Sequence, residues 1–207
     1  MTTRTPAAAA FPDGTIITAA GNGEAGFVVD GGPAAGTKLY NPHSVAVDRE
    51  GNLYIADASN HRVRKVTPSG IITTVAGNGQ AGFVSDGGPA VATQLYHPHS
   101  VAVDGSGNLY IADYSNHRVR KVTPDGIITT VAGNGQAGFV SDGGPAVATK
   151  LNAPIGVAVD GVGNLYIADY GNHRVRKVTP DGIITTVAGN GQAGFVSDGG
   201  PAVATKL

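Results

Sequence analysis

Histidine is the residue type with the widest chemistry in this sequence, and two histidines stand in a repeated Pro-His-Ser-Val segment. These are His43 and His99, and the third copy of the segment has Ile155 in the same place. A neutral imidazole is a good zinc ligand, and a catalytic zinc site needs about three protein ligands plus an open position. One chain therefore offers two such ligands, with His97 as an additional candidate, and two chains would bring four.

A second set of histidines recurs in every copy of an Asn-His-Arg segment, at His61, His117 and His173. An aspartate lies five residues before each of the following arginines, at Asp57, Asp113 and Asp169. Such a carboxylate can pair with the arginine or accept loop N–H groups. Because the pattern is present in every copy, we expect a structural role for it, with ligand binding as the alternative.

The basic stretches that follow these histidines hold nine of the fourteen lysines and arginines. Spread evenly over the copies, they would form a belt of charge and not one patch. The formal net charge is −1. A nucleic-acid or phosphate-binding surface is therefore not expected.

The remaining polar motifs have simpler explanations than catalysis. Asp48, Asp104 and Asp160 precede Gly-Asn and resemble calcium loops, but the spacing lacks the Asp-x-Asp-x-Asp series, and a hairpin turn accounts for them. The aspartate of each Asp-Gly-Gly-Pro segment is expected to be a turn or cap residue. The glycine-rich segments lack the Lys-Ser/Thr of a phosphate loop, and there is no cysteine. We assign no catalytic residue, and zinc or calcium are the only cofactors considered.

A period of 56 residues runs through the chain, because the string Gly-Asn-Gly-x-Ala-Gly-Phe begins at Gly21, Gly77, Gly133 and Gly189. Whole units run over 21–76, 77–132 and 133–188, with partial units at 11–20 and 189–207. Residues 1–10 are expected to be a short disordered leader without the apolar core of a signal peptide. Self-similarity at a fixed period predicts a repeat architecture.

Each unit contains four segments that predict short strands, which in the second unit are 99–104, 109–113, 117–122 and 127–132. They alternate apolar and polar residues or are rich in β-branched ones, and turn residues separate them. The segment 114–116 is expected to be a polar loop. Four short antiparallel strands joined by tight turns and repeated in tandem are typical of a propeller blade. The sequence therefore predicts an all-β fold.

The segment 77–98 links the fourth strand of one unit to the first strand of the next. Connections in compact domains are usually about 4–6 residues long, and long ordered loops are often functional. Pro89 can begin one helical turn. Two interpretations stay open: a spacer that Phe83 and Leu95 pin onto the blade, or a functional loop.

The string PHSVAVDxxGNLYIADxxNHRVRKV resembles the NHL repeat, and the inserted GNGxAGFxxDGGPA is similar to the variant in bacterial repeat proteins and teneurin-type NHL domains. The resemblance covers nearly the whole chain past residue 10. It implies a six-bladed β-propeller around a central channel, with three blades per chain as half of the ring. Loops from strand four to strand one and from strand two to strand three would meet on one face, where such propellers usually bind ligands.

The family includes RNA-binding and protein-binding domains, extracellular sensor domains of bacterial Ser/Thr kinases and an amidating lyase, so the fold does not give the function. In that lyase, zinc-binding histidines lie in similar Pro-His segments that point into the channel. The alternative for His43 and His99 is that they merely line the channel.

Differences between units two and three indicate where a ligand surface lies. Of seven differences, five fall in the window 94–100, which either reflects tailoring of a channel rim or drift. The candidate ligand-binding residues, taken from this window, its equivalents and the neighbouring loops, are Tyr40, His43, Tyr96, His97, His99, Asn152, Tyr114 and Tyr170.

Three blades would leave apolar inter-blade faces uncovered, which predicts a partner. That partner is a second copy that completes the ring as a homodimer, or further blades of a longer chain. The other expected partner is a protein or small-molecule ligand. No membrane partner is expected, since no segment is apolar enough to span a bilayer. We expect a soluble chain in a compartment that the sequence does not fix.

The favoured function is a non-catalytic binding or interaction scaffold. The alternative is a metal-dependent lyase or lactone hydrolase that uses His43 and His99. A third hypothesis is an engineered or purely structural repeat protein with no ligand.

Overall fold

Three four-stranded antiparallel sheets follow one another along the chain in the computed structural model, which describes residues 14–207. The first sheet contains β1 (Pro42–Val47), β2 (Leu53–Asp57), β3 (Arg62–Val66) and β4 (Ile72–Ala76). The second contains β5 (Pro98–Val103), β6 (Leu109–Asp113), β7 (Arg118–Val122) and β8 (Ile128–Ala132). The third contains β9 (Pro154–Val159), β10 (Leu165–Asp169), β11 (Arg174–Val178) and β12 (Ile184–Ala188). Each sheet pairs its strands in chain order, which confirms the predicted all-β fold of four-stranded antiparallel blades.

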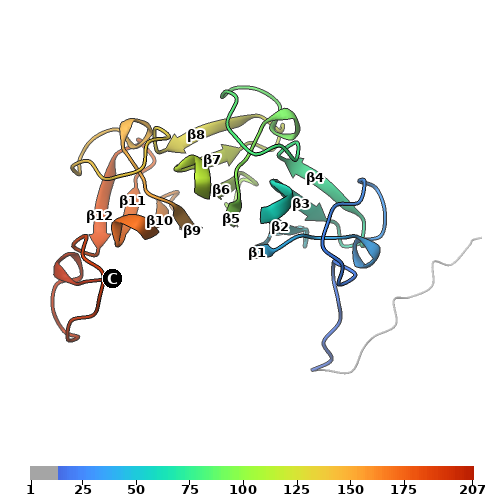
Figure 1. Cartoon of the computed structure of the whole chain (residues 1–207), viewed down its shortest axis with the longest axis horizontal. Coiled ribbons are helices and arrows are strands. Elements are labelled where there is room, and N and C mark those ends of the chain that lie inside the picture. The colour runs from blue at the N-terminus through green and yellow to red at the C-terminus, as the bar shows by residue number, and fades with distance from the viewer. Residues whose placement is uncertain (1–13) are drawn as a thin grey trace, which may run out of the picture.

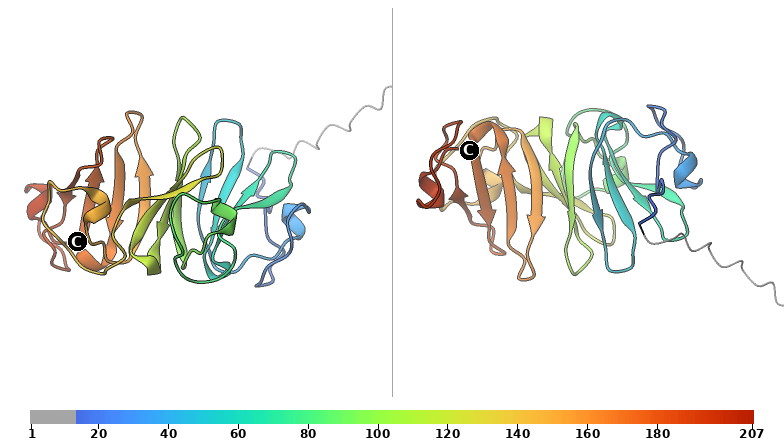
Figure 2. Two further views of the ribbon diagram at one scale, coloured as in Figure 1. Left: turned by 90° about the horizontal axis from the view of Figure 1, so that it is seen from above. Right: turned by 90° about the horizontal axis from the view of Figure 1, so that it is seen from below.

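The blades stand side by side in an arc. Strands β1, β5 and β9 lie along its concave edge, whereas β4, β8 and β12 lie on its convex edge (Figure 1). Seen from above and below, the three sheets are arranged in a row with hairpin turns on two opposite sides (Figure 2). The leader predicted at 1–10 and the first residues of the partial unit 11–20 lie outside the described residues. The unit boundaries stay predictions.

The strands of the second blade begin and end within one residue of the predicted segments. The predicted loop at 114–116 is a short 3-10 helix, η4 (Tyr114–Asn116), and His117 ends it with a left-handed φ of 53°. The equivalent turns are η2 (Ala58–Asn60) and η6 (Tyr170–Asn172). In the turn between β5 and β6, Asp104 accepts hydrogen bonds from the backbone and side-chain nitrogens of Asn108 at 2.9 and 2.7 Å. The hairpin explanation of this aspartate is confirmed.

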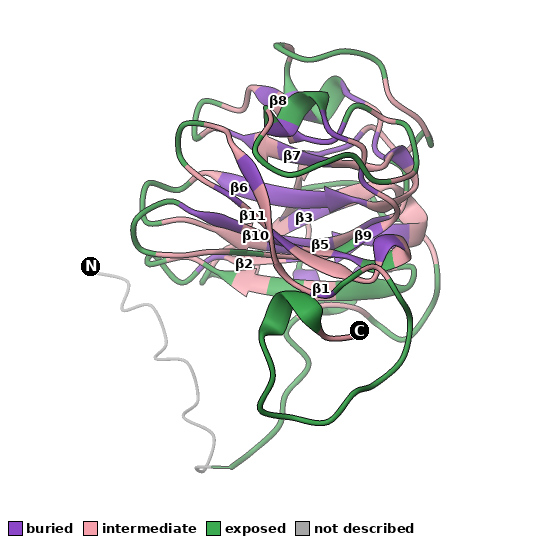
Figure 3. Cartoon of the chain, turned by 90° about the vertical axis from the view of Figure 1, so that its left-hand side faces the viewer, coloured by how far each residue is buried: buried purple, intermediate pink, exposed green. Residues whose placement is uncertain are grey.

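Apolar side chains are buried between neighbouring blades. Ala56 and Val63 of the first blade pack in one cluster with Val101, Ile111 and Ile128 of the second, and a similar cluster joins the second blade to the third. Burial is deepest in the second blade, where all five residues of β6 are buried, and this strand is purple in Figure 3. On the outer face of the first blade, Val45 is 62% exposed, whereas its equivalent Val101 is 4% exposed. The outer face of the first blade therefore exposes an apolar surface whose equivalent on the second blade is buried against the first.

The inserted segment crosses from one blade to the outer strand of the next. Gly87 donates its N–H to the carbonyl of Ile128 at 2.8 Å, and Ala90 donates to the carbonyl of Gly126 at 2.8 Å. Between these bonds and the inner strand, the chain forms the predicted helical turn, η3 (Ala90–Ala92), and buries Leu95 completely. The equivalent turns are η1 (Ala34–Gly36), η5 (Ala146–Ala148) and η7 (Ala202–Ala204). Leu95 thus pins the insert, as the first of the two interpretations expected.

A fully buried arginine joins each insert to its blade. The guanidinium of Arg120 lies 2.8 Å from the carboxylate of Asp86 in the insert and 3.5 Å from that of Asp113 at the end of β6. Asp113 also accepts the N–H of Tyr96 at 2.8 Å and the side-chain amide of Asn116 at 2.8 Å. Equivalent arrangements surround Arg64 and Arg176.

The sequence left two roles open for Asp113, and the structure shows the second of them, because Asp113 accepts the loop N–H of Tyr96. Its ion-pair partner is Arg120 and not Arg118, and Asp86, expected as a turn or cap residue, is a further ion-pair partner of Arg120. Arg118 instead lies with its guanidinium 3.9 Å from the ring centroid of Phe83 and donates to the carbonyl of Asn134. Arg120 is the buried arginine because the insert covers the face of β7 that carries Arg118 and Arg120, with Phe83 over both guanidinium groups and Asp86 paired with Arg120.

Replacing the buried arginine should destabilise the protein strongly. In an Arg120→Met variant, Asp86 and Asp113 lose their counter-charge, and breaking a buried pair in this way costs about 3–5 kcal/mol. Urea unfolding followed by circular dichroism measures the loss. Lys121→Met on the same strand is the matched control and should stay within about 1 kcal/mol of the parent. Equal stability of the two variants would contradict the assigned role of Arg120.

Candidate functional site

A cavity of about 450 Å³ opens at the concave edge of the arc, where the three inner strands meet the turns that follow β6 and β10. Its lining consists of His43, Ser44, His99, Ser100, Tyr114, Ile155 and Tyr170. Four of the eight predicted ligand-binding residues are among them: His43, His99, Tyr114 and Tyr170. The structure therefore brings residues from all three blades to one place.

A β-bulge at the start of each inner strand sets the direction of these histidines. In β5, Pro98 pairs with Asp113 and Ser100 pairs with Ala112, so His99 is the extra residue between them. The same shift occurs in β1 at His43 and in β9 at Ile155. A bulge re-aims a side chain out of the regular alternation of a strand. His43, His99 and Ile155 therefore occupy equivalent positions in three neighbouring blades.

Three aromatic rings form a stack along this edge. The ring centroids of His43 and His99 are 4.2 Å apart, and those of His99 and Tyr114 are also 4.2 Å apart, with interplanar angles of 26° and 17°. Tyr114 comes from η4, and the equivalent residue of the first blade is the small, buried Ala58. On the third blade, Ile155 and the 59%-exposed Tyr170 continue the lining.

Partial burial lowers the pKa of His99, and the neighbouring imidazoles of His43 and His97 lower it further. A histidine with a lowered pKa is neutral at pH 7, so its ring can accept a hydrogen bond, bind a metal ion or stack without bringing a charge. Among residues 14–207, no group of three or more His, Asp or Glu side chains lies close enough together to hold a metal ion.

The other four candidates lie just before the inner strands and do not line this cavity. The backbone N–H groups of Tyr40, Tyr96 and Asn152 donate to the aspartates that end β2, β6 and β10. The side chain of Asn152 donates to the carbonyl of Gly171 at 3.1 Å. His97 lies next to His61, with ring centroids 4.9 Å apart. Ligand contact by these four residues stays a prediction.

The cavity also contains residues that we did not predict from the sequence. Ser44 and Ser100 line it, and their hydroxyl oxygens accept the N–H groups of Val101 and Val157 across the blade boundaries at 3.3 and 3.2 Å. The sequence signals for Ser100 and Ile155 were their place in the repeated segment that carries His43 and His99 and their place among the differences between units two and three.

Comparisons with known proteins agree with this geometry. The NHL repeat profile matches residues 39–66 and 95–122, and the teneurin NHL domain profile matches residues 135–204. Teneurin-4 of Mus musculus is 30% identical over 173 residues, which are 77% of this chain and 6% of the relative. The protein SUPPRESSOR OF QUENCHING 1 of Arabidopsis thaliana is 33% identical over 92 residues, or 44% of this chain and 8% of the relative. The chain thus spans less than a tenth of either relative.

Two solved structures are similar in fold. A structural genomics protein of unknown function from Bacteroides thetaiotaomicron superimposes with a TM-score of 0.62 and 26% identity, over 80% of this chain and 40% of that one. An auxiliary nutrient binding protein from Bacteroides ovatus superimposes with a TM-score of 0.59 and 20% identity, over 82% and 42% of the two chains. Within residues 14–207, no helix has the length and apolar character needed to span a bilayer.

Removing one ring of the stack should change the titration of the next. In a His43→Ala variant, the pKa of His99 should rise toward its usual 6.5, because His99 becomes more exposed and loses a neighbouring imidazole. Titration of the imidazole signals by NMR measures this pKa. The pKa of His61, which burial, His97 and Arg62 lower, is the internal reference and should not move. An unchanged His99 pKa in the variant would show that the stack does not form.

Proposed function

Because this chain belongs to the NHL-repeat family, we propose that it is a non-catalytic binding scaffold whose ligand is contacted at the concave edge of the arc. The observation that carries the proposal is the stack of His43, His99 and Tyr114 beside an open cavity. Ligand pockets combine apolar and aromatic walls with a few polar groups. Here the rings form the walls, and the serine and tyrosine hydroxyls are the polar groups.

The stack favours a ligand with a flat, uncharged ring. Aromatic pairs prefer offset-stacked or edge-to-face arrangements and contribute about 0.5–1.5 kcal/mol beyond burial. His99 is held between His43 and Tyr114, and Tyr170 offers an exposed ring on the next blade. A planar group of a small molecule or a ring from a protein side chain would satisfy the same surface.

A complete ring of six blades would enclose this edge in a central channel. The exposed Val45 and its neighbour Val47, 64% exposed, require the cover that the equivalent valines receive inside the arc. Further blades of a longer chain would supply it, as would a second copy of this chain. We propose the second copy, so that the ring is a homodimer of two arcs.

The second candidate function is a metal-dependent lyase or lactone hydrolase. The observation in its favour is the proximity of His43 and His99, whose rings are stacked at 4.2 Å. A catalytic zinc site needs about three protein ligands, so a second copy would have to contribute the others. This candidate makes a distinct prediction, namely stoichiometric metal that depends on His99.

A matched pair of substitutions tests the binding site. His99→Ile gives the second blade the residue of the third, and Ile155→His does the reverse, so neither introduces a side chain foreign to the position. With indole as the probe, His99→Ile should weaken binding up to about tenfold, because His43 and Tyr114 lose the ring that holds them in one aromatic wall, and Ile155→His should strengthen binding by extending that wall. Chemical-shift titration measures the affinities. Equal affinities in all three proteins would contradict the proposed site.

The same His99→Ile variant separates the two functions. Its thermal midpoint should change little, corresponding to less than about 1 kcal/mol, because Ile155 fills the equivalent position. Elemental analysis of protein purified without nickel resin measures bound zinc. Stoichiometric zinc that disappears in the variant would favour the enzyme, whereas indole binding without zinc is the result that we expect. Absence of both would leave a purely structural repeat protein.

A further inference from the structure

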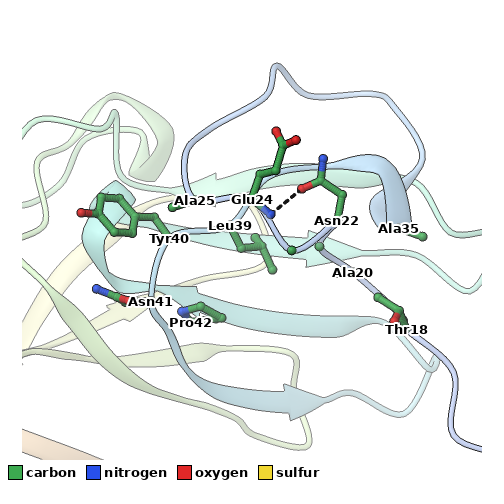
Figure 4. A pocket seen from close by; sticks show the side chains of 12 residues that line it. Thr18, Ala20, Asn22, Glu24, Ala25, Ala35, Leu39, Tyr40, Asn41 and Pro42 are labelled. Carbon is green, nitrogen blue, oxygen red and sulfur yellow. Dashed lines mark hydrogen bonds between the residues drawn. The ribbon is translucent and has the colours of Figure 1, made fainter.

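A cavity of about 890 Å³ lies at the N-terminal end of the arc. Residues 18–25 form one wall and residues 39–42 form the other, as Figure 4 shows for Asn22, Leu39 and Asn41. We call this cavity the edge groove. It lies beside the start of β1, the strand that carries the exposed Val45.

At the two internal blade boundaries, the equivalent place is filled by a His-Arg pair of the preceding blade. Arg62 donates to the carbonyl of Asn78 at 2.7 Å, and His61 accepts the N–H of His97 through its Nδ1 at 3.2 Å. The second boundary repeats both contacts, as Arg118 donates to Asn134 and His117 accepts from Ala153. These histidines therefore have the structural role that the sequence predicted.

Glycines show that the edge groove has the shape of this pair. A Cβ at Gly79 or Gly135 would collide with the guanidinium of Arg62 or Arg118. A Cβ at the equivalent Gly23 would meet no atom within 4 Å. Asn41 already has the left-handed φ of 50° that His97 and Ala153 have at the internal boundaries, with values of 50° and 54°. The first unit is therefore preformed to receive a His-Arg pair.

The third blade carries such a pair, His173–Arg174, and the chain covers it with its own residues 189–207, called here the C-terminal segment. Arg174 donates to the carbonyl of Asn190 at 3.0 Å. Residues 192–204 of the segment are exposed and drawn in green in Figure 3. Phe195 is 79% exposed, whereas Phe27 and Phe139 are each 38% exposed because they lie on arginines of a blade. The last residues of the segment return to its start, where Gly189 and Asn190 donate to the carbonyls of Ala202 and Thr205, so the C-terminal segment is held on the third blade alone.

We propose that the edge groove receives His173–Arg174 of a second copy of this chain, and that the C-terminal segment competes with that copy for Arg174. The proposal rests on the proposed closure of the ring by two copies and names the surface that closes it. Residues 21–39 and 189–207 have nearly the same sequence, so either can cover the pair. The N–H of Asn41 would donate to Nδ1 of His173, as at the internal boundaries.

Replacing glycine by alanine should weaken dimerisation of the full chain at Gly23 and strengthen it at Gly191. Gly23 and Gly191 have φ values of 86° and 89°, so alanine strains both backbones equally. Gly23→Ala would collide with Arg174 of the second copy and should weaken dimerisation. Gly191→Ala collides with Arg174 of its own chain and should release the C-terminal segment, which strengthens dimerisation. We expect changes of about tenfold, the equivalent of about 1.4 kcal/mol.

Light scattering over a range of concentrations gives the dissociation constants, and circular dichroism checks the fold. Gly126→Ala, at a φ of 82° with open space around it, is the control for backbone strain and should leave dimerisation unchanged. A single-chain mass for the parent and for Gly191→Ala at every concentration would overturn both the docking surface and the closure by two copies. Dimerisation that is equal in all the proteins would overturn the docking surface alone. Indole binding is measured separately, so the fate of the ligand site is distinguishable from either result.

Discussion

A buried guanidinium must be compensated by opposite charge, and in each blade two aspartates from different parts of the chain do this for one arginine. Asp86 arrives from the inserted segment and Asp113 from the end of β6, so Arg120 ties three parts of the unit together. Burial raises the pKa of Asp113 to about 6, while the N–H of Tyr96, the Asn116 amide and Arg120 oppose that rise. The carboxylate therefore depends on all of these partners for its charged form.

The same carboxylate connects the core of the blade to the candidate site. Asp113 holds the N–H of Tyr96, from which the chain turns through the left-handed His97 into the bulge of β5. The bulge aims His99 between His43 and Tyr114, and Tyr114 itself begins the turn that Asn116 ends. The stack is thus a consequence of how the arginine fixes the entry to each inner strand.

Local patterns in the sequence were sufficient to predict the strands, the hairpin turn at Asp104 and the helical turn after Pro89, because each depends on neighbouring residues. The partner of Asp113 was not predictable in this way: Arg118 and Arg120 share one face of β7, and only the crossing insert decides which is buried. His43, His99, Tyr114 and Tyr170 were predicted as ligand contacts and do line one cavity, and ligand contact by them stays a prediction. Tyr96 and Asn152 lie apart from it, because positive φ values at His97 and Ala153 reverse the chain first.

Native-state hydrogen exchange of the Tyr96 amide is the most direct test of the account, because this N–H joins the buried ion pair to the entry of the inner strand. If the arginine and its aspartates hold the insert, the Tyr96 amide should exchange as slowly as the amides of β6, because both become accessible only when the whole blade opens. Amides of the exposed residues 193–201, between the two hydrogen-bonded ends of the C-terminal segment, should exchange much faster. A Tyr96 amide that exchanges at the rate of the C-terminal segment would contradict the account.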